Sequence, residues 1–94
     1  MSEVPAPAAH GRVLLVEDQP ALRRAYARIL EGAGYAVMQA ADGRHATDAL
    51  MAECYDVILT DITMPGMSGT QLLRAVRERG LDVPVLLVTA NPTV

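Results

Sequence analysis

The chain has 94 residues, 8 of them basic and 11 acidic, so its formal net charge is −3. All the basic residues are Arg and are scattered along the sequence, which argues against the basic face of a nucleic-acid-binding module. Hydrophobic residues make up 51% of the chain, too many for a disordered protein, yet no apolar run approaches the ~20 residues that span a bilayer. The single cysteine, Cys54, cannot form an internal disulfide, and the N-terminus does not resemble a signal peptide. We therefore expect a globular cytoplasmic domain that contacts neither nucleic acid nor membrane directly.

The first eleven residues differ in composition from the rest of the chain. They include two prolines and three alanines and show no apolar periodicity. Such a segment buries too little surface to offset the entropy lost on ordering. We expect a flexible leader over residues 1–11 and a folded domain over residues 12–94.

Short apolar segments alternate with helical patterns after the leader. Residues 13–16 are continuously apolar, as in a strand that is buried on both faces of a parallel sheet. Asp18 or Gln19 can then cap a helix that has Pro20 in its first turn. The apolar positions that recur at helical spacing in this helix are Leu22, Ala25, Tyr26, Ile29 and Leu30.

The same pair of patterns recurs along the chain. Residues 35–40 predict a second strand, and a helix opens at residues 42–43. Residues 57–60 predict a third strand, followed by a loop rich in Pro and Gly and a helix that extends to Gly80. Residues 85–88 predict a fourth strand. This alternation predicts an α/β fold, a doubly wound and mainly parallel sheet with helices on its faces and right-handed crossovers.

Three carboxylates stand where predicted strands end. Glu17 and Asp18 follow the first strand, and Asp61 follows the third. Ligand sites of open α/β sheets lie outside the carboxyl ends of the strands, where the strand order reverses. Converging carboxylates repel one another unless a cation neutralises them, and a hard divalent ion with oxygen ligands, Mg²⁺, is the natural partner. Taken singly, Asp18 is equally well explained as a helix cap, and Asp61 as an ordinary loop residue.

Three motifs follow one another along the chain. The first is Leu-Leu-Val-Glu-Asp over residues 14–18, followed by Pro20. The second is Tyr-Asp-Val-Ile-Leu-Thr-Asp over 55–61 with Met-Pro-Gly-Met-Ser-Gly over 64–69, and the third is Pro-Val-Leu-Leu-Val-Thr-Ala over 84–90. In this order they resemble the receiver domain of two-component response regulators, and the resemblance extends from about Arg12 to the end of the chain. It implies a flavodoxin-like sheet with the strand order 2-1-3-4.

The resemblance also implies roles for individual residues. Asp61 matches the aspartate that accepts a phosphoryl group from a histidine kinase, and Glu17 and Asp18 match the acidic pair that holds Mg²⁺. Thr63 would offer its backbone carbonyl to the metal. Three residues after the fourth strand complete the implied site: Thr89 as the switch hydroxyl, Ala90 as the small residue of the phosphoryl pocket, and Asn91, which together with Thr63 would tune hydrolysis of the acyl phosphate.

The chain departs from the family pattern at its C-terminal end. The family fold has five βα units, whereas the fourth helix, fifth strand and fifth helix have no counterpart in residues 12–94, which read as an incomplete receiver domain. The family's lysine and aromatic switch residue belong to that part, and no lysine occurs elsewhere. Because strand 85–88 would then be an exposed apolar edge, we expect a homodimer formed through this edge or by exchange of elements.

These observations support three hypotheses about function. The leading one is a Mg²⁺-dependent phosphoacceptor that receives its phosphoryl group from a sensor histidine kinase or phosphotransfer protein and switches an output domain or partner. It predicts no external substrate. The alternative is a truncated, non-switching fragment that acts as a self-associating interaction module. An aspartate-dependent phosphohydrolase is the weakest, because Thr63 stands where its second aspartate is expected.

Overall fold

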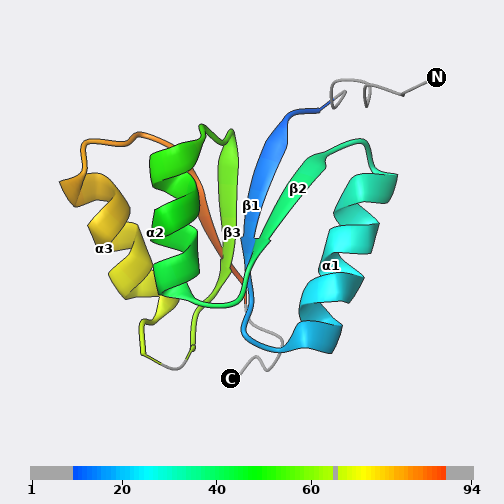
Figure 1. Cartoon of the computed structure of the whole chain (residues 1–94), viewed down its shortest axis with the longest axis horizontal. Helices are drawn as coiled ribbons and strands as arrows, with labels where there is room; N and C mark the ends of the chain where they lie inside the picture. The colour runs from blue at the N-terminus through cyan, green and yellow to red at the C-terminus, as the bar shows by residue number, and fades with distance from the viewer. Residues whose placement is uncertain (1–9, 65, 89–94) are drawn as a thin grey trace.

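A computed structural model describes residues 10–64 and 66–88 of the chain (Figure 1). The helices and strands alternate as the sequence predicts: β1 (Arg12–Val16), α1 (Pro20–Gly32), β2 (Ala36–Ala40), α2 (Gly43–Ala52), β3 (Val57–Asp61), α3 (Gly69–Glu78) and β4 (Val85–Val88). Strand β2 begins one residue later than predicted, and β3 includes Asp61 as its last residue. Of the two candidate caps for α1, the N-cap residue is Gln19.

All four strands pair in parallel, in the order β2-β1-β3-β4. In the register, Leu14 of β1 lies between Met38 of β2 and Ile58 of β3, and Ile58 in turn pairs with Val85 of β4. Helix α1 covers one face of the sheet, and α2 and α3 cover the other (Figure 1). The predicted doubly wound fold and its strand order are therefore confirmed.

The main hydrophobic core lies between the sheet and helices α2 and α3. Alternate residues of the central strands point toward these helices, because successive side chains of a strand face opposite sides. The buried members of this core are Leu14, Val16, Ala40, Ala46, Ile58, Met64, Leu72 and Val76. This packing fixes the ends of β1 and β3, from which the candidate site is built.

The opposite face of the sheet is covered over β1 and β2 but open beside β4. Leu86 of β4 is 56% exposed, and Ile29 of α1 is 67% exposed. Although Ile29 is one of the apolar residues that recur at helical spacing in α1, it is exposed, and the buried residue of this helix is Ala27.

The structure also describes part of the expected leader and the surroundings of Cys54. Of the expected leader, only His10 and Gly11 are described. The N–H of His10 donates to the carbonyl of Gly34, between α1 and β2, and the carbonyl of Gly11 accepts from the N–H of Ala36, the first residue of β2. Cys54 is exposed. None of the helices in residues 10–64 and 66–88 combines the length and the apolar character that a membrane crossing needs.

Candidate functional site

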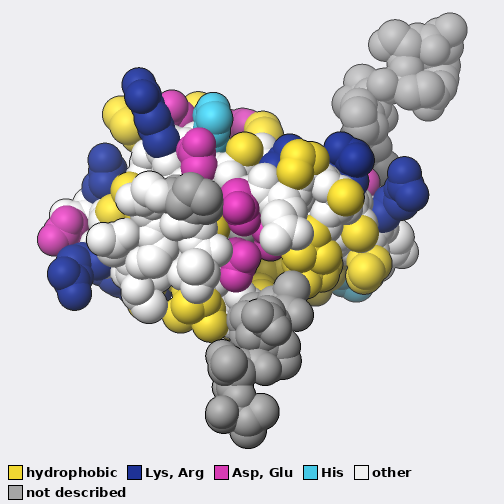
Figure 2. Space-filling view, turned by 90° about the horizontal axis from the view of Figure 1, so that it is seen from below, with side chains coloured by type: hydrophobic (Ala, Val, Ile, Leu, Met, Phe, Trp, Pro, Cys, Tyr) yellow, Lys and Arg dark blue, Asp and Glu magenta, His cyan; other side chains and the backbone are white. Residues whose placement is uncertain are grey.

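The carboxyl ends of β1 and β3 bring the three predicted carboxylates together. Glu17 follows the last residue of β1, and Asp61 is the last residue of the neighbouring strand β3. Glu17, Asp18 and Asp61 each offer a carboxylate oxygen, and these oxygens lie within 4.8 Å of one another. Acidic side chains accordingly gather near the centre of the face that carries the strand ends (Figure 2). The convergence expected from the sequence is present.

Burial and the neighbouring carboxyl groups both disfavour the ionised form of Glu17. Its side chain is only 2% exposed, and burial is the main reason that its pKa lies above the ordinary value of 4.5. The carboxyls of Asp18 and Asp61 raise this pKa further, while the backbone N–H of Gln19, which donates to Oε2 at 3.0 Å, lowers it. Among the described residues, no Arg or His side chain forms an ion pair with any of the three carboxylates. The cluster therefore has the negative charge and hard oxygen ligands that a divalent cation requires.

Asp61 is held by the chain that follows it. The backbone N–H of Thr63 donates a long hydrogen bond of 3.4 Å to Oδ1 of Asp61, and the Thr63 side chain is exposed. The N–H of Gly69, at the start of α3, donates to the carbonyl of Ile62 at 2.8 Å. A Cβ at Gly69 would overlap the carbonyl oxygen of Asp61, so only glycine lets α3 approach the end of β3 this closely.

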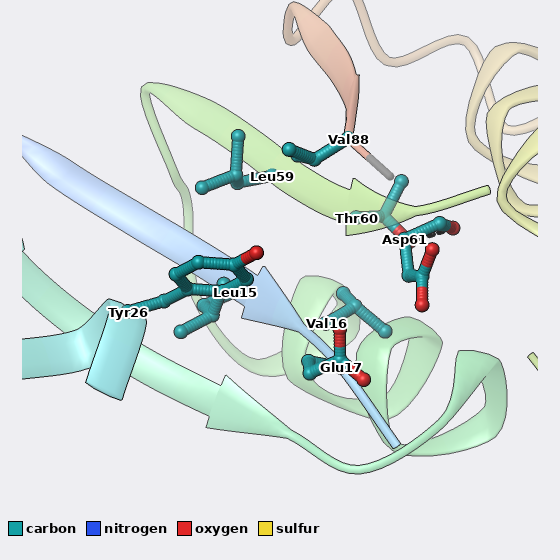
Figure 3. Close-up of a pocket in the computed structure, with 8 residues that line it drawn as sticks. All are labelled: Leu15, Val16, Glu17, Tyr26, Leu59, Thr60, Asp61 and Val88. Carbon is teal, nitrogen blue, oxygen red and sulfur yellow. Dashed lines mark hydrogen bonds between the residues drawn. The ribbon is translucent and has the colours of Figure 1, made fainter. Parts of the chain in front are cut away.

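A small hollow lies beside the cluster on the α1 side of the sheet (Figure 3). Its lining includes Tyr26 of α1, Leu59 and Asp61 of β3, and Val88 of β4. Val88 pairs with Asp61 in the sheet, and its carbonyl accepts a hydrogen bond from the N–H of Ile62 at 3.1 Å. The last described residue of β4 therefore lies beside the candidate phosphoacceptor.

The remaining predicted site residues are not all within the described part of the chain. Thr89, Ala90 and Asn91 lie outside it, so their implied roles stay predictions. The sequence analysis assigned no role to two described neighbours of the site: Gly69, which lies against the carbonyl of Asp61, and Arg23, whose Nη1 donates to the carbonyl of Glu17. The Ser-x-x-Gln pattern at Ser68 could have placed Gly69 at a helix start. For Arg23, apolar periodicity gives no signal.

The comparison with protein families gives a specific result. Residues 13–94 match the model of the response regulator receiver domain. The chain belongs to this family. Its acidic cluster at the ends of β1 and β3 resembles the phosphorylation site of receiver domains, which are signalling modules of two-component systems and generally not enzymes.

Several named proteins contain a region similar to this receiver domain. The response regulator MprA of Mycolicibacterium vanbaalenii is 37% identical over 83 residues, which cover 88% of this chain and 36% of MprA. The transcriptional regulatory protein DltR of Streptococcus agalactiae is 38% identical over 80 residues, covering 85% of this chain and 36% of DltR. The sensor histidine kinase RcsC of Salmonella typhimurium is 40% identical over 79 residues, covering 84% of this chain and 8% of RcsC. The receiver domain thus spans about a third, or less, of these relatives.

Solved structures show the same fold. The chemotaxis protein CheY4 of Vibrio cholerae superposes with a TM-score of 0.81 at 36% identity, covering 87% of this chain and 70% of CheY4. The response regulator TrrA of Thermotoga maritima, solved in complex with Mg²⁺-BeF, superposes with a TM-score of 0.80 at 32% identity, covering 85% of this chain and 70% of TrrA. The fold of this receiver domain is therefore shorter than that of its solved relatives.

Proposed function

We propose that this receiver domain is a phosphoacceptor that takes a phosphoryl group on Asp61 in a Mg²⁺-dependent reaction. The observation that supports this most strongly is the cluster of Glu17, Asp18 and Asp61, whose carboxylate oxygens lie within 4.8 Å of one another without a neutralising side chain among the described residues. A carboxylate cluster that includes the buried Glu17 is costly unless a cation binds it.

The residues present fit Mg²⁺, since each of the three supplies a hard oxygen ligand and the ion ordinarily keeps several waters. Glu17 and Asp18 would hold the ion, together with Asp61 and the backbone carbonyl of Thr63. When bound, Mg²⁺ shields the equatorial oxygens of a phosphoryl group during its transfer. That TrrA was solved in complex with Mg²⁺-BeF supports this assignment for a protein of the same fold.

In the proposed reaction, a carboxylate oxygen of Asp61 attacks the phosphorus of a phosphohistidine. The new P–O bond forms as the P–N bond breaks, and the electron pair returns to the imidazole nitrogen, which takes up a proton. The donor is a sensor histidine kinase or phosphotransfer protein. Thr89, Ala90 and Asn91 belong to the proposed site as switch hydroxyl, small pocket residue and modulator of hydrolysis, and Thr63 shares the last role.

Phosphorylation replaces the single negative charge of the Asp61 carboxylate with the roughly −1.5 to −2 charges of a phosphoryl group, a net gain of about one negative charge or less at the end of β3. We propose that this charge alters the surface around the site and thereby controls an output domain or partner. The proposal is consistent with the names of relatives such as the transcriptional regulatory protein DltR, which is longer than this chain.

The test is the intact mass of the protein after incubation with Mg²⁺ and a small-molecule phosphodonor. We expect a gain of one phosphoryl group in the unchanged protein and none in Asp61→Asn. Asp48→Asn is the matched control, because Asp48 is an exposed residue of α2 outside the cluster and should leave labelling unchanged. Equal labelling of Asp61→Asn would remove Asp61 from its proposed role.

The open edge of β4 favours a second candidate function, a self-associating interaction module. Leu86 and Leu87 are 56% and 39% exposed, and β4 is the terminal strand of the described sheet. Edge strands with exposed apolar side chains readily pair with another chain. This candidate predicts association that does not depend on phosphorylation.

A further inference from the structure

The turn between β1 and α1 carries Glu17 and Asp18 but lacks the usual fixation of a helix start. The N-cap residue of α1 is Gln19, whose side chain forms no capping hydrogen bond, and Pro20 follows it in the first turn. Helix starts are ordinarily held by a Ser, Thr, Asp or Asn cap that is worth about 1 kcal/mol. Something else must therefore hold this turn in place.

The guanidinium of Arg23 supplies one such restraint. Its Nη1 donates to the backbone carbonyl of Glu17 at 2.8 Å, reaching back from the second turn of α1. The N–H of Glu17 donates to the carbonyl of Ala40, at the end of β2, at 3.1 Å. Both backbone groups of Glu17 are thus fixed, one by the neighbouring strand and the other by Arg23.

A further hydrogen bond links this backbone to the carboxylates. The N–H of Gln19 donates to Oε2 of Glu17 at 3.0 Å. This hydrogen bond joins the two residues that flank Asp18. Asp18 therefore lies between two residues whose positions depend on hydrogen bonds within the turn. Metal sites depend on such supporting contacts, because they hold the ligands in place before the ion arrives.

The contact of Arg23 is with the backbone and not with a carboxylate. Among the described residues, its side chain hydrogen-bonds to the Glu17 carbonyl, and no ion pair joins it to Glu17, Asp18 or Asp61. Arg23 also lines a groove together with Gln39, Ala40 and Ala41, at the end of β2 and just beyond it. Its position suits a brace for the turn better than a counter-ion for the cluster.

We propose that Arg23 is a positioning residue, which holds the Glu17–Asp18 turn in the geometry that binds Mg²⁺. The proposal rests on the proposed function, because it assumes that the carboxylate cluster binds this ion. For the loss of Arg23, it predicts a change in Mg²⁺ affinity opposite to the change that simple electrostatics predicts. Removing a positive charge near an acidic cluster should tighten cation binding, whereas removing a brace should weaken it.

The first measurement is a MgCl₂ titration followed by the amide chemical shifts of the turn. We expect Arg23→Gln to weaken Mg²⁺ binding about two- to tenfold, the equivalent of one lost hydrogen bond. Arg24→Gln is the matched control, because it removes the same charge from an exposed neighbouring position of α1 and should change the affinity by less than about twofold. Arg23→Lys keeps the charge and a donor, and we expect an affinity between those of Arg23→Gln and the unchanged protein.

The second measurement needs no metal. We expect amide exchange of the Gln19 N–H, in the presence of EDTA, to be about two- to tenfold faster in Arg23→Gln than in Arg24→Gln. Circular dichroism verifies folding, and Arg23→Lys provides the comparison if Arg23→Gln does not fold. Unchanged exchange at Gln19, or Mg²⁺ binding by Arg23→Gln as tight as or tighter than that of the unchanged protein, would overturn the proposal. Absence of Mg²⁺ binding in the unchanged protein would instead overturn the proposed function, while the exchange result still decides whether Arg23 braces the turn.

Discussion

Glu17 shows how the fold keeps a carboxylate in an unfavourable place. It is 2% exposed at the end of a buried strand, and its pKa lies above the ordinary value of 4.5, mainly because of burial. A raised pKa means that the folded chain holds this proton more tightly than the unfolded chain does. Above pH 4.5 the folded state therefore loses stability as the pH rises, until Glu17 is ionised in both states.

This sign leads to a prediction for Glu17→Gln, which keeps the shape and the acceptor for the Gln19 N–H but removes the charge. In EDTA near neutral pH, we expect this variant to unfold at higher urea concentration than the unchanged protein. Each unit by which the pKa is raised corresponds to about 1.4 kcal/mol. Urea titrations at a series of pH values measure the effect, and an equally steep fall in stability above pH 4.5 in both proteins would contradict it.

Gly69 acts on the site through the backbone. A Cβ there would meet the carbonyl of Asp61 and lie 3.0 Å from Cδ2 of Leu87, so we expect Gly69→Ala to destabilise the fold by about 1–3 kcal/mol. Gly32→Ala is the matched control, because a Cβ at Gly32 meets nothing within 4 Å. At this last residue of α1, alanine should be neutral or stabilising by up to about 1 kcal/mol. Thermal unfolding compares the two, and equal melting temperatures would show that Gly69 does not constrain the end of β3.

At the scale of elements, local patterns in the sequence predict most of this fold. Residues 13–16 are apolar without interruption because β1 is central and covered on both faces. The exposure of Ile29 could not be predicted in the same way, because helical spacing shows which apolar residues share a side of α1 but not which of them are buried. Arg23 could not be predicted either, since its contact is with a backbone carbonyl that the sequence pattern does not reveal.

The start of α3 supports a prediction about an element. Ser68 accepts a hydrogen bond from the N–H of Gln71 at 3.2 Å, and the Gln71 side chain accepts one from the N–H of Ser68 at 2.8 Å, which forms a capping box. We expect Ser68→Ala to lower the free energy of unfolding by about 1 kcal/mol, and Ser68→Asp, which can still cap, to lower it much less. Urea denaturation measures both, and an unchanged midpoint for Ser68→Ala would show that the cap is dispensable.

At the scale of the whole molecule, the candidate site is predictable because topology brings it together. Asp61 is distant in sequence from the adjacent residues Glu17 and Asp18, but neighbouring parallel strands end at the same edge of the sheet. What the sequence did not predict is the local support of the site: the brace from Arg23 and the close approach of Gly69. Both depend on how α1 and α3 pack against the strand ends.

The open half of the sheet supports a prediction about association. If β4 mediates self-association, we expect Leu86→Lys to raise the dissociation constant about tenfold or more, because an apolar contact is replaced by a charge at an edge strand. Met51→Lys is the matched control, since Met51 is 75% exposed on α2. Analytical ultracentrifugation over a wide concentration range measures the effect. A monomer at every concentration of the unchanged protein would contradict association through this edge.

The central proposal is that Asp61 accepts a phosphoryl group with the help of a Mg²⁺-binding carboxylate cluster. Its most direct test is to label the protein with a small phosphodonor, reduce the acyl phosphate with borohydride, and locate the resulting homoserine by peptide mass spectrometry. We predict homoserine at position 61, formed when Mg²⁺ is present and lost in EDTA. Homoserine at another aspartate, or labelling of Asp61 that does not depend on Mg²⁺, would contradict the proposal.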